Sequence, residues 1–63
     1  MNKLKELRIS KGLTQQQLSE LSGVKISTLQ KYENDVNDIK RARVDMLYKL
    51  SQALGTTIEQ LII

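Results

Sequence analysis

The chain has 63 residues, no cysteine, no histidine and a formal net charge of +3 at neutral pH. This length predicts a single domain over residues 1–63, whose core supplies a stability margin of about 3–5 kcal/mol. Without cysteine or histidine the chain has no disulfides, no thiolate metal site and no usual general acid–base residue, so we expect no enzyme and no cofactor. Because charges interrupt the apolar stretches, we expect no signal peptide or membrane span, and the expected location is the cytoplasm.

A first helix is predicted over residues 2–11. Asn2 is its best N-cap, and Leu4 and Leu7 give it an apolar face at i, i+3 spacing. Gly12 follows as the stop signal, because glycine readily takes the positive φ that ends a helix.

A second helix begins after Thr14. The Thr14 hydroxyl can accept a hydrogen bond from the backbone of Gln17, while the Gln17 side chain reaches back, so the two residues form a capping box. Leu18 and Leu21 are expected on the apolar face of this helix. Gly23 then ends it.

A third helix is expected from Ile26 to Tyr32 or Glu33, after a corner filled by Val24. Leu29 and Tyr32 face inward at i, i+3 spacing. Its opposite face carries polar side chains, namely Ser27, Thr28, Gln30 and Lys31. Two short helices joined by a glycine turn, the second with a polar outer face, indicate a helix-turn-helix.

The sequence predicts that residues 34–43 form a polar, ordered loop, which Val36 and Ile39 anchor to the body of the domain. The clearest amphipathic helix is expected over residues 44–54, because apolar residues recur there at intervals of three and four. These residues are Val44, Leu47, Leu50 and Leu54.

Gly55 is the predicted end of that helix. Thr57 and Gln60 form a second Thr-x-x-Gln capping box, which opens a short last helix. Its apolar face consists of Ile58, Leu61 and Ile62. No alternation of period two is long enough for a strand, so the sequence predicts an all-α fold, a compact five-helix bundle.

The stretch GLTQQQLSELSGVKISTLQKYEN, residues 12–34, resembles the DNA-binding domain of the phage repressor and Cro family (Xre-like regulators). That family carries Leu-Thr-Gln before its first motif helix, Gly-Val at the turn and Glu-Asn at the end of the recognition helix. These motifs stand here at residues 13–15, 23–24 and 33–34. The likeness continues through LKELRISKG upstream and LYKLSQALGTTIEQLI downstream, so it covers nearly the whole chain. It implies a sequence-specific regulator that binds double-stranded DNA.

The resemblance, carried over position by position, implies base contacts from Lys25, Ile26, Ser27 and Lys31. Lysine can donate to guanine O6 and N7, serine can bond several bases, and isoleucine can pack on a thymine methyl group. Ile26 can equally be a half-buried packing residue. The family usually has Ser or Thr as the N-cap of its recognition helix, whereas this chain has Lys25 at that position. If the helix started later, Ser27 would be the cap.

Phosphate contacts are implied for Gln15, which lies at the partly positive N-terminus of the second helix. Thr28 and Asn34 are further phosphate candidates. Lys40 and Arg41 either follow the DNA backbone or are ordinary solvated loop charges.

The charges are unevenly distributed. Cations cluster in the recognition helix and the segment after it, at Lys25, Lys31, Lys40, Arg41 and Arg43, whereas the acidic Glu6, Glu20 and Glu59 lie elsewhere. Arg8 is either solvated or paired with Glu33. The resemblance favours the pair, as a partly buried structural contact between the first helix and the recognition helix.

The resemblance also implies a repressor that binds a two-fold symmetric operator as a homodimer, with half-sites about 34 Å apart. The predicted dimer interface is the exposed part of Ile58, Ile62 and Ile63, although the last two can instead fold back on the core. The alternative function is a protein-interaction module, such as an antitoxin with the same fold. We expect neither a small-molecule ligand nor a membrane as partner.

Overall fold

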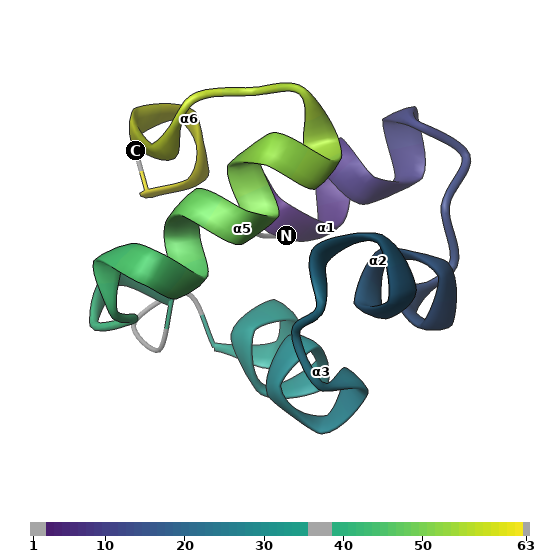
Figure 1. The fold of residues 1–63 in the computed structure, drawn as a ribbon, viewed down its shortest axis with the longest axis horizontal. Coiled ribbons are helices and arrows are strands. Elements are labelled where there is room, and N and C mark those ends of the chain that lie inside the picture. Colours follow the sequence, from purple (N-terminus) through teal and green to yellow (C-terminus); the bar gives the residue numbers. More distant parts are fainter. Residues whose placement is uncertain (1–2, 36–38, 63) are drawn as a thin grey trace.

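The computed structural model describes residues 3–35 and 39–62, and these contain helices and no strand (Figure 1). The helices are α1 (Lys3–Ser10), α2 (Gln15–Ser22), α3 (Ile26–Asn34), α5 (Val44–Leu54) and α6 (Ile58–Ile62). The molecule is nearly isotropic, with principal extents of 23 × 22 × 21 Å. Over these described residues the predicted all-α, five-helix architecture is confirmed.

Helix α5 lies across the molecule in Figure 1, with α6 above it, α2 to the right and α3 below. The core is aliphatic and draws on every one of these helices. Its buried members are Leu4, Leu18, Val24, Leu29, Ile39, Leu47, Leu50, Leu54 and Leu61. Burial of apolar area is the main force that holds such short helices together, because an isolated helix of eight to eleven residues is marginal in water.

The start of the second helix forms as the sequence predicts. The Thr14 hydroxyl accepts from the Gln17 N–H at 3.1 Å, and Gln17 Oε1 accepts from the Thr14 N–H at 2.9 Å. At the other end Gly23 takes a φ of 77°, and its N–H donates to Ser19 O at 2.8 Å. Val24 is 1% exposed and fills the corner between α2 and α3. The turn of the motif is therefore confirmed.

Two residues that were predicted on the apolar faces of their helices are exposed, Leu21 at 63% and Val44 at 72%. The buried row of α2 is Leu18 and Ser22, and Leu21 lies about 80° round the helix from the centre of that row. Val44 is the first residue of α5, so its side chain leans back past the helix end, where no other helix covers it. Leu21 instead borders an open groove of about 440 Å³, lined by Leu21, Ser22, Tyr48, Lys49, Gln52 and Ala53.

The last helix has half of its predicted capping box. Thr57 Oγ1 accepts from the Gln60 N–H at 3.2 Å, as expected. The Gln60 side chain, however, accepts a hydrogen bond from the Thr56 hydroxyl, so the reciprocal half of the box was predicted wrongly. A second threonine beside Thr57 provides a competing donor. Gly55 ends α5 with a φ of 65°, as predicted.

The polar connection between α3 and α5 is only partly described. Ile39 is fully buried, as predicted, and Ile39 and Lys40 have helical backbone, which differs from the expected loop. Val36, the other predicted anchor, and Asn2, the predicted cap of α1, lie outside the described residues. Within residues 3–35 and 39–62, no helix is long and apolar enough to cross a membrane.

Candidate nucleic-acid interface

The outer face of α3 carries the side chains that the sequence assigned to DNA bases. Leu29 and Glu33 are buried and Tyr32 is half-buried, so the opposite side of α3 faces solvent. The solvent-facing residues of this region are Lys25, Ile26, Ser27, Gln30, Lys31 and Asn34. All four candidate base-contacting residues are therefore accessible. The alternative role of Ile26 was packing against the domain. Its side chain is 40% exposed, so it is accessible to a ligand even if it also packs.

The recognition helix begins without a side-chain cap. Its N-cap residue is Lys25, with φ −61° and ψ 143°, and the lysine side chain makes no capping hydrogen bond. Ser27 lies inside the first turn and is not the cap, so that alternative was wrong. A helix N-terminus leaves backbone N–H groups without intrahelical partners and carries a partly positive charge. This end of α3 therefore presents donors beside the side chains of Ile26 and Ser27.

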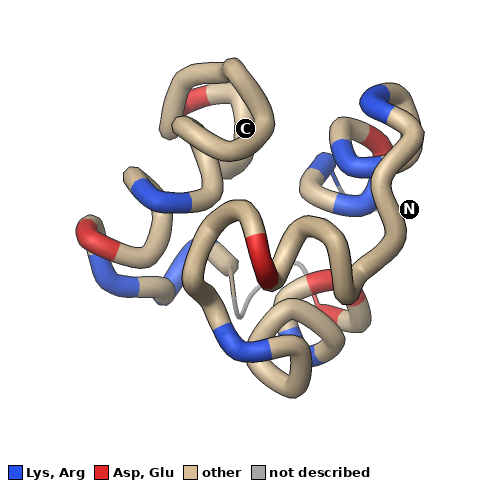
Figure 2. Tube along the Cα trace, turned by 45° about the vertical axis from the view of Figure 1, so that its right-hand side comes forward, with Lys and Arg blue, Asp and Glu red and all other residues tan. Residues whose placement is uncertain are grey.

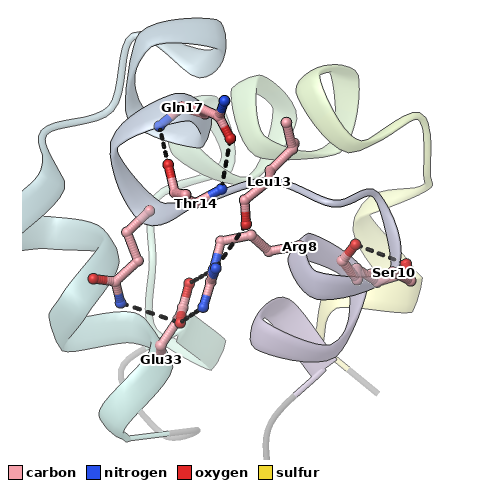
Figure 3. A network of polar contacts seen from close by, with 8 residues as sticks. Arg8, Ser10, Leu13, Thr14, Gln17 and Glu33 are labelled. Carbon is pink, nitrogen blue, oxygen red and sulfur yellow. Dashed lines mark hydrogen bonds and ion pairs between the residues drawn. The ribbon is translucent and has the colours of Figure 1, made fainter.

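A polar network ties α1, α2 and α3 together (Figure 3). Arg8 Nε donates to Glu33 Oε2 at 2.8 Å, and Arg8 Nη2 donates to Glu33 Oε1 at 3.1 Å. A third guanidinium nitrogen donates to Leu13 O at 2.8 Å. The side chains of Arg8 and Glu33 are 12% and 2% exposed. A planar guanidinium bound at two oxygens of a carboxylate fixes distance and angle, so this pair sets how α3 lies against α1.

Gln15 joins the same network, which the sequence did not reveal. Its Nε2 donates to Glu33 Oε1 at 3.2 Å, so the first residue of α2 is held against the far end of α3. In the part of the chain that the structure describes, the second N–H of the amide and the backbone N–H of Gln15 have no partner, so both can donate to a phosphate oxygen. The contact thus links a candidate phosphate-binding residue to the recognition helix.

The remaining phosphate candidates surround α3. Figure 2 shows the Lys and Arg residues of α3 and of the segment leading into α5 in the lower half of the molecule. Lys40, Arg41 and Asn34 are exposed and Thr28 is half-buried. Within the described residues, the cations without a carboxylate partner include Lys25, Lys31, Lys40 and Arg41.

Arg43 differs from those four cations. Its Nε lies 3.4 Å from Asp45 Oδ1, and both side chains are well exposed, at 84% and 55%. Exposed pairs of this kind contribute little to stability. Because Asp45 offsets its charge locally, Arg43 adds less to the positive surface than Lys40 or Arg41 does.

The residues assigned to a dimer interface lie near the C-terminal end of the chain. Ile58 and Ile62 are half-buried and pack against the core, while Ile63 lies outside the described residues. The part of Ile58 and Ile62 that remains accessible is therefore small. In the part of the chain that the structure describes, no group of three His, Cys, Asp or Glu residues is arranged to hold a metal ion.

Comparison with known families identifies the chain. Residues 4–61 match the family model HTH_3, described as helix-turn-helix. No curated protein and no solved structure matches. The match begins at buried Leu4 and ends at buried Leu61, so it includes the polar network and the whole of α3. The chain therefore belongs to the Cro/C1-type helix-turn-helix family of DNA-binding regulators.

Proposed function

We propose that this protein is a sequence-specific transcriptional regulator, a repressor that inserts α3 into the major groove of double-stranded DNA. The observation that carries the proposal is the outer face of α3, which is polar, basic and accessible around Ile26. A helix with its side chains is about 10–12 Å across, and the major groove is about 12 Å wide. The N-terminal end of such a helix is the part that reaches the base edges.

Each side chain on this face suits a different base feature. Lys25 and Lys31 can donate to guanine O6 and N7, and Ser27 can donate or accept. Ile26 can contact the methyl group of a thymine. Lys31 follows Ser27 by four residues, so these two side chains share one row of the helix.

Phosphate contacts would hold α3 in register without reading sequence. Gln15 is the first of these contacts, since it lies at the N-terminus of α2 and is bonded to Glu33 of the recognition helix. Asn34 and Thr28 can donate hydrogen bonds to phosphates, and Lys40 and Arg41 can neutralise them. The family membership and the exposure of Asn34, Lys40 and Arg41 support this assignment.

Repression would follow from occupancy, because a protein bound over a promoter excludes RNA polymerase. We propose a homodimer on a two-fold symmetric operator, with half-sites about 34 Å apart. Extents of 23 × 22 × 21 Å allow two subunits to touch while their recognition helices enter successive major grooves on one side of the duplex. The proposed contact is formed by Ile58, Ile62 and Ile63.

The experiment that tests the function is selection of bound duplexes from a random pool, followed by sequencing. We expect enrichment of one motif with two-fold symmetry. A pool that stays random after repeated rounds at low salt would contradict a sequence-specific function.

Lys31→Ala is expected to weaken binding to the selected duplex by about 1–3 kcal/mol and to relax the preference at one base position. The reason is that a lysine that donates to guanine loses this contact only on the correct sequence. The measurement is a titration of labelled duplexes with each base in turn. Lys49→Ala, an exposed lysine of α5, is the control and should change little. An equal loss on all sequences would instead identify Lys31 as a phosphate contact.

Ile63→Glu is expected to lower the apparent mass at high protein concentration, because it introduces a charge into the proposed dimer contact. It should also weaken binding to a two-half-site operator more than to a single half-site. Sedimentation of the free protein and titration of both duplexes provide the measurement. Ile9→Glu, at an apolar residue of α1 that is 53% exposed, is the control. A monomer at all concentrations, unchanged by Ile63→Glu, would eliminate this interface.

A further inference from the structure

Gln30 lies inside the face of α3 that we expect to meet the bases. Successive residues of an α-helix are rotated by about 100°. Viewed down the helix axis, an arc of about 140° therefore contains, in angular order, Ile26, Gln30, Ser27 and Lys31. Gln30 is about 40° from Ile26 and thus lies between Ile26 and Lys31. It is exposed, in the second turn of the helix, at the same depth as Lys31.

The Gln30 amide differs from the amides of Gln15 and Gln17, which hold the described part of the fold together. Within the described residues it has no hydrogen-bond partner, in contrast to Gln15, which donates to Glu33, and Gln17, which completes the cap of α2. Glutamine and alanine are both good helix formers, and Gln30 is exposed and is not a member of the hydrophobic core. This exposed amide, which has no partner among residues 3–35 and 39–62, can therefore contact a ligand.

The chemistry of an amide selects one base. Gln30 carries a carbonyl acceptor and an N–H₂ donor side by side. Adenine presents the complementary pair in the major groove, an N6 donor beside an N7 acceptor, whereas guanine presents two acceptors. Cytosine and thymine each present one hydrogen-bonding group there, so neither can bind both ends of the amide.

We propose that Gln30 is a further specificity-determining residue, which reads an adenine through its N6 and N7 atoms. This inference rests on the proposed function, because it requires α3 to lie in the major groove. Ile26 and Gln30 are about 6 Å apart along the helix axis, which corresponds to one or two base-pair steps of 3.4 Å. The operator half-site therefore contains an adenine for Gln30, one or two steps from the base pair whose thymine methyl meets Ile26.

The test compares the motifs selected from a random duplex pool by the wild type, Gln30→Ala and Gln30→Glu. Gln30→Ala should lose the preference for adenine at one position, with a loss of about 5- to 150-fold on the selected duplex. Gln30→Glu should change the preference at that position to cytosine, since a carboxylate accepts from cytosine N4. Gln52→Ala, on α5, is the matched control and should leave the motif unchanged. Circular dichroism establishes that each variant is folded.

An atomic substitution in the selected duplex gives a second test, which measures affinity directly. Replacing the adenine with 7-deazaadenine removes only the N7 acceptor, so it should weaken binding of the wild type and have no effect on Gln30→Ala. If the wild type selects a motif and Gln30→Ala keeps every preference in it, the assignment of Gln30 is wrong while the proposed function stands. If the wild type selects no motif, the proposed function fails, and the inference fails with it.

Discussion

Arg8→Ala is expected to unfold a large fraction of the protein at 25 °C. The substitution leaves the Glu33 carboxylate, 2% exposed, without the guanidinium that binds both of its oxygens. Removing one partner of a buried ion pair costs about 3–5 kcal/mol. A domain of this size has a stability margin of similar magnitude, about 3–5 kcal/mol. The loss should therefore consume most of the free energy of unfolding.

Urea unfolding followed by circular dichroism measures this effect. Arg8→Lys should be intermediate, because lysine keeps the charge but cannot bind two carboxylate oxygens and Leu13 O at once. Arg43→Ala is the control, since its pair with Asp45 is exposed and contributes little. Arg8→Met combined with Glu33→Leu should regain much of the stability, because no unpaired charge remains. Equal stability of Arg8→Ala and Arg43→Ala would show that the network is dispensable.

Binding to DNA is expected to fall about 10³- to 10⁴-fold between 50 and 200 mM salt. If three or four cations per subunit touch DNA, a dimer neutralises roughly six to eight phosphates and releases their counterions. The slope of log K against log salt is then about −5 to −7, at about −0.9 per phosphate. The cations concerned are Lys25, Lys31, Lys40, Arg41 and Arg43.

Replacing Lys40 and Arg41 together with alanine should flatten that slope by up to about two units per subunit, without changing the preferred sequence. Replacing Lys3 and Lys49, which lie on α1 and α5, is the matched control for the change in net charge. A slope near zero for the wild type would make the cations ordinary solvated surface, and a protein-interaction module would then be the better account of the chain.

The local signals in the sequence predict much of the fold. The Thr14–Gln17 box and the turn at Gly23 depend on residues within a few positions of each other, so they can be recognised without knowledge of packing. The bounds of α5 follow from its apolar spacing and from Gly55, and α5 does run from Val44 to Leu54.

The features that could not be predicted from the sequence depend on how the helices pack against one another. Apolar spacing placed Leu21 on the apolar face of its helix, but the direction from which α5 packs on α2 leaves this side chain at the edge of an open groove. The bond between Gln15 and Glu33 joins residues 18 positions apart, and no local pattern indicates it. The sequence placed Gln30 on the polar face of the third helix, but its exposure and its lack of a partner among the described residues depend on the packing of α3.

A competition titration measures whether α3 reads a DNA sequence. The full chain is bound to the duplex selected from the random pool at 150 mM salt, and an unlabelled shuffled duplex of the same composition is added as competitor. We expect the selected duplex to bind at least about 10³-fold more tightly than the shuffled one, the lower end of the range for specific regulators. Equal affinities for the two duplexes would contradict the account, because phosphate contacts alone cannot distinguish them.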